Sequence, residues 1–124
     1  MTELRPGNSG RVPSPKRGEV WLVNFNPGRG SEQKGVRPAL VVQNNVGNQY
    51  AATTIVAAIT TTIKPYPVTV VIRARTCGLP YDSMVNMAQV LTVDKRRLIR
   101  KLGELAPEQL AAANRALRVS LDLN

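Results

Sequence analysis

Short runs of apolar and β-branched residues alternate along the chain with turn-forming residues, as is typical of β-strands. The first run covers residues 19–25 (EVWLVNF), and a second covers residues 37–43. Residues 53–60 are almost continuously apolar, so we expect a strand that is buried on both faces. Two further strands are expected at residues 68–75 and 83–93. The pattern therefore predicts a mainly β protein.

Glycine, proline and asparagine mark the connections between these strands. Residues 26–30 (NPGRG) end the first run and open a polar loop that continues to residue 37. Residues 44–48 have the composition of a turn, two prolines at 65 and 67 precede the fourth strand, and residues 78–82 form a loop.

The last part of the chain predicts a helix. Pro107 suits the first helical turn, where its missing N–H would have no partner. Leu110, Ala113, Leu117 and Leu121 recur at helical spacing and predict one apolar face. Several short strands followed by one helix favour a small, partly open β-barrel capped by a C-terminal helix.

The chain of 124 residues has the length of one domain. Residues 1–16 are rich in proline, glycine and serine, so we expect a flexible N-terminal tail followed by a folded domain at residues 17–124. No stretch approaches the roughly 18 apolar residues of a membrane span, and the N-terminus lacks the order of a signal peptide. We therefore expect a cytoplasmic protein that does not bind a membrane.

Charge is the unusual part of the composition. The chain has 17 Lys and Arg residues against 8 Asp and Glu, a formal charge of +9. Such an excess favours a polyanionic partner such as nucleic acid, although an acidic protein or a membrane surface would also satisfy it. The densest basic run is either a patch that binds phosphates or an acidic partner protein, or simply a solvated surface. It comprises Lys95, Arg96, Arg97, Arg100 and Lys101.

The composition also limits the available chemistry. The chain has no histidine, which removes the commonest general base and metal ligand. Cys77 is the single cysteine, so an internal disulfide is impossible and a reducing compartment is expected. We expect no metal and no cofactor, and any catalysis must need few groups from the protein.

Arg37 is the first candidate functional residue. It lies where the polar loop of residues 30–37 (GSEQKGVR) runs into the second strand, so its side chain is held firmly and still reaches solvent. An arginine at such a junction offers a fixed fork of donors that suits a phosphate. Pairing with Glu19 or Glu32 is the structural alternative.

Several segments resemble the MazF/PemK toxins of bacterial toxin–antitoxin systems. They are residues 17–21 (RGEVW), 30–38 (GSEQKGVRP), 42–44 (VQN), 55–60 (IVAAIT) and 89–95 (QVLTVDK), in the family's order and followed by a Leu-rich helix. The resemblance extends roughly from residue 16 to residue 124. It implies an SH3-like barrel of the CcdB/PemK type, a homodimer, and a cognate MazE-like antitoxin that occupies the RNA groove.

The resemblance also implies an activity, which is the sequence-specific cleavage of single-stranded RNA without a metal. The RNA 2′-OH would attack the phosphate and leave a 5′-hydroxyl and a 2′,3′-cyclic or 3′-phosphate. Arg37 corresponds to the cation that stabilises the phosphate charge, with proton donation to the leaving 5′-oxygen as a second role. Thr60 corresponds to a hydroxyl that bonds a phosphate oxygen, although strand threonines are also common for packing reasons. The group that takes the 2′-OH proton stays open.

Polar residues of the same segments are implied to bind RNA, because amides and hydroxyls suit base edges. The candidates are Ser31, Gln33, Lys34, Asn44 and Gln89. A solvated loop explains the polar residues Ser31 and Gln33 almost as well.

One departure from the family bears on the mechanism. Ala88 stands before Gln89, where family members often carry an acidic residue, so a mechanism that needs this carboxylate is in doubt. One rival function is a CcdB-like toxin that binds gyrase and cleaves nothing. Arg37 and Thr60 favour the nuclease, and the chain lacks the terminal tryptophan associated with CcdB. A non-catalytic RNA-binding module is the second rival.

Overall fold

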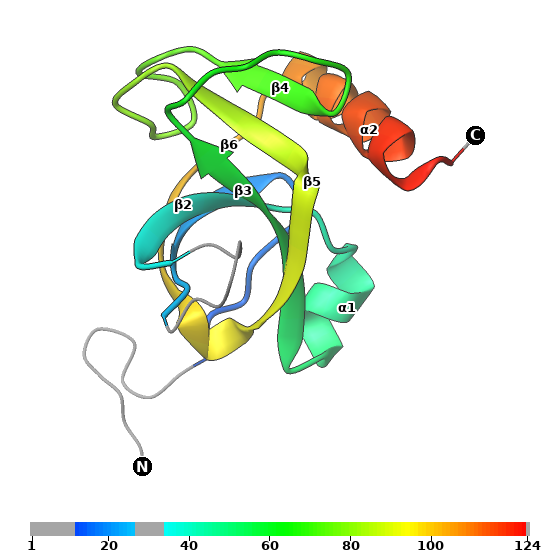
Figure 1. Ribbon diagram of the computed structural model, residues 1–124. Coiled ribbons are helices and arrows are strands. Elements are labelled where there is room, and N and C mark those ends of the chain that lie inside the picture. Colours follow the sequence, from blue (N-terminus) through cyan, green and yellow to red (C-terminus); the bar gives the residue numbers. More distant parts are fainter. Residues whose placement is uncertain (1–11, 27–33, 124) are drawn as a thin grey trace.

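The computed structural model describes residues 12–26 and 34–123, in which a strongly curved antiparallel sheet is covered by a C-terminal helix (Figure 1). The strands are β1 (Glu19–Asn24), β2 (Val36–Val41), β3 (Thr53–Thr60), β4 (Thr69–Ile72), β5 (Ser83–Asp94) and β6 (Leu98–Glu104). The helices are α1 (Asn45–Tyr50), the 3-10 helix η1 (Lys95–Arg97) and α2 (Pro107–Leu121). The prediction of a mainly β protein with a C-terminal helix is confirmed.

Within the described residues, the six strands form one sheet in the order β4-β5-β3-β2-β1-β6. β4 and β6 are its two edges, so the sheet is barrel-like but not closed. β3 lies between β5 and β2, and its residues from Val56 to Ile59 are all buried. The expectation that residues 53–60 form a strand buried on both faces is therefore confirmed.

Two apolar clusters cover the two faces of the sheet. The first core packs under α2 and includes Val20, Leu40, Ala57, Val85 and Ala113. The second core lies on the other face of the sheet and consists of Val23, Phe25, Ala39, Val41, Val56, Val93 and Leu98. Because side chains alternate along a strand, neighbouring residues of β3 contribute to different cores.

Three segments differ from the sequence-based expectation. Residues 44–48 belong to a short helix instead of a turn, because Asn44 Oδ1 accepts a hydrogen bond from Gly47 N at 2.8 Å and caps α1. β4 ends at Ile72 and does not reach residue 75, since Arg75 and Cys77 have positive φ angles of 66° and 56° and turn the chain. β6 was not expected, because its basic residues hide the strand pattern.

The predicted start of α2 at Pro107 is confirmed. Its N-cap Ala106 has no side-chain acceptor, but Gln109 Oε1 accepts from Ala106 N at 2.7 Å. Ala113 faces the first core as expected, whereas the prediction for Leu121 is wrong, since that side chain is 53% exposed. The helix ends at Leu121, one residue after its last hydrogen bond to the sheet. No helix in the described part of the chain is long and apolar enough to cross a membrane.

The N-terminal segment begins, within the described residues, at Val12. Residues 1–11 lie outside the described structure, whereas Pro15 is fully buried. Arg17 then joins three parts of the fold, because its backbone N donates to Asn45 Oδ1 at 2.7 Å and its guanidinium bonds Val42 O and Asn114 Oδ1 at 2.9 and 2.8 Å.

Candidate active site

Arg37 is the second residue of β2 and lies opposite Val23 of β1. Its guanidinium is exposed, and its Nε donates to the carbonyl oxygen of Lys34 at 2.8 Å. Within the described residues, the terminal guanidinium nitrogens have no hydrogen-bond partner. The side chain is thus oriented at one nitrogen, while the others can bind an anion from solvent.

The alternative that Arg37 pairs with Glu19 is wrong, because Glu19 has other partners. Its Oε1 accepts from Trp21 Nε1 and Lys16 N, both at 2.8 Å, and its Oε2 lies 3.3 Å from Lys101 Nζ. Burial raises the pKa of the Glu19 carboxyl, but these hydrogen bonds and the ammonium outweigh burial and lower its pKa overall. Glu32 lies outside the described residues.

The loop that precedes Arg37 is held together at its two ends. Gly35 N donates to Asn26 Oδ1 at 2.8 Å, and Phe25 N donates to Gly35 O at 2.8 Å. Gly35 has a φ of +74°, a conformation that favours glycine. Arg97 Nη1 donates to the carbonyl oxygens of Asn24 (3.2 Å) and Asn26. These contacts fix the loop ends next to Arg37. The sequence analysis identified Asn26 only as the start of a turn and not as a residue that holds the loop, and the basic run gave no sign that Arg97 anchors the loop.

Thr60 is the last residue of β3. The β2–β3 ladder pairs Ala39 with Ala58, and the same register continued by two residues places Arg37 across from Thr60. Both residues fall on the face of the second core, because they follow Ala39 and Val56 in alternation. Thr60 is half-buried, and its Oγ1 accepts from Thr62 N at 3.1 Å. With an acceptor position occupied, the hydroxyl hydrogen can be donated to an oxygen of a ligand.

Gln89 lies in β5, beside an irregularity in its pairing with β3. Alternation places it on the same face as Leu91, which packs against the second core. Arg37 and Thr60 are on this face as well, and Gln89 precedes Val90, the partner of Ala57. Register and alternation therefore put Arg37, Thr60 and Gln89 on one face of the sheet, and Lys34 contacts Arg37 through its carbonyl oxygen.

Asn44 is not part of this group. It follows the other end of β2, seven residues after Arg37, which corresponds to roughly 20 Å along an extended strand. Its side-chain oxygen caps α1, so the amide nitrogen is the group left for a ligand. The other candidates, Ser31 and Gln33, lie outside the described residues.

The basic run has mostly structural contacts. Lys95 is only 6% exposed, and its Nζ donates to Asn48 O at 2.5 Å and to Ala51 O at 2.9 Å, at the end of α1. Arg96 bonds both oxygens of Asp94, at 3.0 and 2.8 Å, and lowers the pKa of that carboxyl to about 2. The carboxylates of Glu104 and Glu19 beside Lys101 raise the pKa of its amine.

Arg100 is the exception in this run, since it is exposed and makes no hydrogen bond or ion pair within the described residues. The run is therefore not a uniform surface patch. Lys95 in particular is not the solvated or phosphate-binding residue that either interpretation of the sequence expected.

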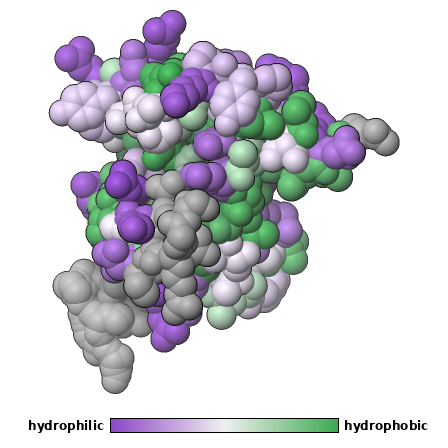
Figure 2. All heavy atoms as spheres, viewed as in Figure 1, coloured by the Kyte–Doolittle hydropathy of each residue, from purple (hydrophilic) through white to green (hydrophobic). Residues whose placement is uncertain are grey.

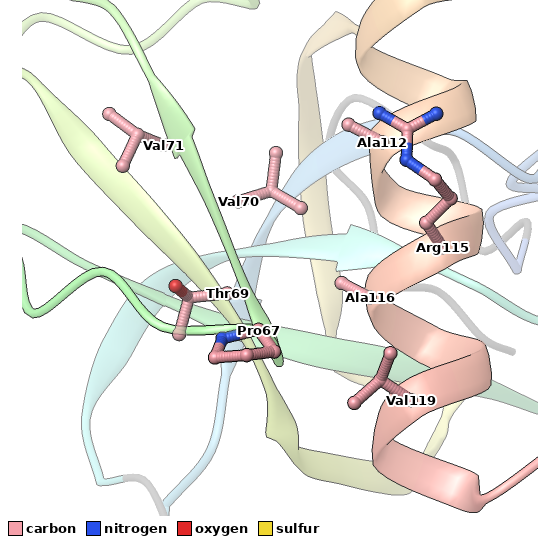
Figure 3. A pocket seen from close by; sticks show the side chains of 8 residues that line it. All are labelled: Pro67, Thr69, Val70, Val71, Ala112, Arg115, Ala116 and Val119. Carbon is pink, nitrogen blue, oxygen red and sulfur yellow. The ribbon is translucent and has the colours of Figure 1, made fainter.

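The described residues form a groove away from Arg37, and they contain no metal-binding cluster. Within residues 12–26 and 34–123, no group of three or more Cys, Asp and Glu side chains is placed to hold a metal ion. A groove of about 360 Å³ lies between β4 and α2, where Val70 faces Ala116 and Val119, and Arg115 stands at one end (Figure 3).

Comparison with known proteins gives a consistent result. The family model for PemK-like, MazF-like toxins of type II toxin–antitoxin systems matches residues 16–121. Endoribonuclease EndoA of Bacillus subtilis (strain 168) is 44% identical over 110 residues, which cover 87% of this chain and 95% of that protein.

Solved structures agree with the sequence matches. An endoribonuclease from a mycobacterial species, in complex with its cognate antitoxin, superposes with a TM-score of 0.75 at 29% identity, covering 89% of this chain and 97% of that one. MazF from Deinococcus radiodurans superposes with a TM-score of 0.75 at 28% identity, covering 89% and 98%.

Proposed function

Because the chain belongs to the PemK-like, MazF-like family of type II toxin–antitoxin toxins, we propose that it is a toxin that cleaves single-stranded RNA at specific sequences. The proposal is supported by the 44% identity to an endoribonuclease and by a cation and a hydroxyl that share one face of the sheet. The match begins at residue 16, which supports a toxin domain at residues 17–124. Its substrate would be messenger RNA, so the protein would act in the cytoplasm.

RNA supplies the nucleophile for this reaction. The 2′-oxygen forms a bond to the adjacent phosphorus, and the bond from phosphorus to the 5′-oxygen breaks. The 2′-OH loses its proton, and the leaving 5′-oxygen gains one. The products are a 5′-hydroxyl and a 2′,3′-cyclic phosphate, which water can open to a 3′-phosphate. The protein has to align the groups and stabilise a phosphorane with additional negative charge.

Arg37 and Thr60 have the chemistry that this step requires. The terminal nitrogens of Arg37 would bind the non-bridging phosphate oxygens, where negative charge grows in the transition state. The hydroxyl hydrogen of Thr60 would bond one of these oxygens, since Oγ1 already accepts from Thr62 N. The chain's own residues would thus act by charge and orientation, without a metal ion.

Five residues are assigned to RNA binding. Lys34 contacts Arg37 through its carbonyl oxygen and Gln89 follows the irregularity in β5, whereas Asn44 lies at the far end of β2 and would contact a nucleotide further along the RNA strand. Ser31 and Gln33 are assigned to the same RNA-binding surface from the sequence alone.

The partners proposed for the toxin are a second copy of the chain and a MazE-like antitoxin. The homodimer is supported by apolar side chains that gather over β5 and beside α2 (Figure 2) and by the groove between β4 and α2, whose Val71 and Val119 are exposed. The antitoxin is supported by the complex of the mycobacterial relative with its cognate antitoxin. The charge of +9 suits an acidic segment in that partner.

The proposal is tested by incubating the full chain with a long single-stranded RNA in EDTA and mapping the fragment ends. The wild type should give discrete cuts with 5′-hydroxyl ends. Arg37→Ala should lower the rate by about 100- to 1000-fold while circular dichroism and sedimentation show an unchanged fold and dimer. Arg100→Ala removes an exposed arginine without a described partner and serves as the matched control.

Undiminished cleavage by folded Arg37→Ala would remove Arg37 from the mechanism. If the RNA stays intact with the wild type and with both variants, the protein is not a nuclease under these conditions, and the gyrase-binding alternative is favoured. Cuts that disappear in EDTA and return with a divalent ion would contradict the metal-independent step.

A further inference from the structure

β5 contains a large irregularity immediately before Gln89. Ala58 pairs with Asn86 and Ala57 pairs with Val90, so the register with β3 skips residues 87–89. β5 bends sharply along its length (Figure 1). Irregularities of this kind redirect side chains and are common next to active sites. The direction of Gln89 therefore depends on how the backbone of residues 87–89, here called the β5 bulge, is held.

The bulge is held by contacts from outside its ladder with β3. Met87 N donates to Val68 O at 2.8 Å, and Ala88 N donates to Asn86 Oδ1 at 2.9 Å. The carbonyl oxygen of Met87 accepts from Ser120 Oγ at 2.6 Å. Met87 is 1% exposed, so few water molecules can replace a lost partner there. Ser120 thus gives α2 a direct bond to the bulge.

We propose that Ser120 is a positioning residue for RNA recognition. By bonding Met87 O it fixes the β5 bulge and with it the direction of Gln89. The inference rests on the proposed ribonuclease function and deepens it, because it connects the C-terminal helix to the RNA-binding face. Ser120 touches no reacting atom and acts only through the backbone that carries Gln89.

The test compares Ser120→Ala with Asn114→Ala, a control on the same helix. Asn114 Oδ1 accepts from Arg17 Nη2 at 2.8 Å, so Asn114→Ala also removes a hydrogen bond made by α2, but one that does not go to the β5 bulge. Ser120→Thr retains the hydroxyl and is the rescue variant. Three quantities are measured on the full chain: amide hydrogen exchange of residues 87–90, kcat and KM on an RNA with one cleavage site, and the preference among RNAs changed at single bases.

Ser120→Ala should speed exchange at residues 87–90 and lower kcat/KM by about 10- to 100-fold, with a changed base preference, as expected when a recognition group is displaced. Asn114→Ala should leave all three near wild type, and Ser120→Thr should restore them. Adding Gln89→Ala to Ser120→Ala should lower kcat/KM little further, because both changes remove the same contact between Gln89 and RNA.

Two results would overturn the positioning role. One is unchanged exchange at residues 87–90 in Ser120→Ala, and the other is additive losses in the double variant with Gln89→Ala. A wild type that cleaves no RNA would instead reject the proposed function, and the role of Ser120 in recognition with it, while the exchange data would still show whether Ser120 holds the bulge.

Discussion

Lys95 provides the sharpest test of the structural role assigned to the basic run. Its side chain is buried, and Nζ donates to Asn48 O and Ala51 O, so it joins the end of α1 to η1. Asn48 in turn is buried and accepts from Thr54 Oγ1 at 2.7 Å. The perturbation is Lys95→Met, which keeps most of the aliphatic stem and removes the donor.

The expected loss follows from these two bonds. A hydrogen bond to a charged group contributes about 1.5–3 kcal/mol to the free energy of unfolding, and leaving a buried carbonyl without a donor lowers that free energy by a comparable amount. Ala51 is half-buried, so water can partly replace its bond, whereas the buried Asn48 has less access to water. We therefore expect Lys95→Met to lower the free energy of unfolding by about 2–4 kcal/mol. For a domain of this size the melting temperature should fall by roughly 10 °C.

The assay is urea unfolding at constant salt, followed by far-UV circular dichroism, with Arg100→Met as the control. Arg100 belongs to the same run but is exposed, so its replacement should change the free energy of unfolding by less than about 0.5 kcal/mol. If Lys95→Met unfolds within about 0.5 kcal/mol of wild type, the buried bonds do not stabilise α1 and the reasoning is refuted.

Two further predictions concern a cap and a carboxyl. Asn44→Asp keeps an oxygen that caps α1 but replaces the amide donor by a carboxylate oxygen. The variant should therefore keep the wild-type melting temperature and lower the rate of RNA cleavage by about 10-fold or more. Cleavage at the wild-type rate would show that Asn44 acts only as a helix cap. Asp94 has a pKa lowered from 3.8 to about 2 by Arg96, so its stabilising contribution is present above pH 4 and is lost as the pH falls toward 2. Denaturant titrations at several pH values should show that the wild type loses unfolding free energy relative to Asp94→Asn between about pH 4 and pH 2. The loss should be less than about 1 kcal/mol, because the Asp94–Arg96 pair is exposed. If the unfolding free energies of the two proteins fall in parallel with pH, this prediction is wrong.

The central strands could be predicted from the sequence because burial leaves a local signal. β3 is apolar on both faces, and its observed bounds are those expected. β6 lies at the sheet edge and carries basic residues on its exposed face, so its pattern resembles a polar connection. α1 depends on one capping asparagine and on contacts of Asn48 with Gln43 and Thr54, which no local pattern reveals.

The candidate site could be predicted only in part for the same reason. Arg37 and Thr60 stand at strand ends that local patterns locate, and a plausible pairing of the two strands brings them together. The roles of Arg97 and Ser120 depend on contacts with residues 71 and 33 positions away in sequence. Side-chain type alone could not separate the buried Lys95 from the exposed Arg100 in the basic run.

The geometry of the proposed catalytic pair depends on the cores more than on the polar residues around it. Side chains alternate along a strand with a period of two, so a slip of one residue between β2 and β3 would move Thr60 to the opposite face from Arg37. Such a slip would also exchange Val56 of the second core with Ala57 of the first. Because both faces of β3 are buried, the slip would leave apolar volume unmatched on each side and is strongly disfavoured. The packing of β3 therefore holds the cation and the hydroxyl on one face, even though neither core residue can contact RNA.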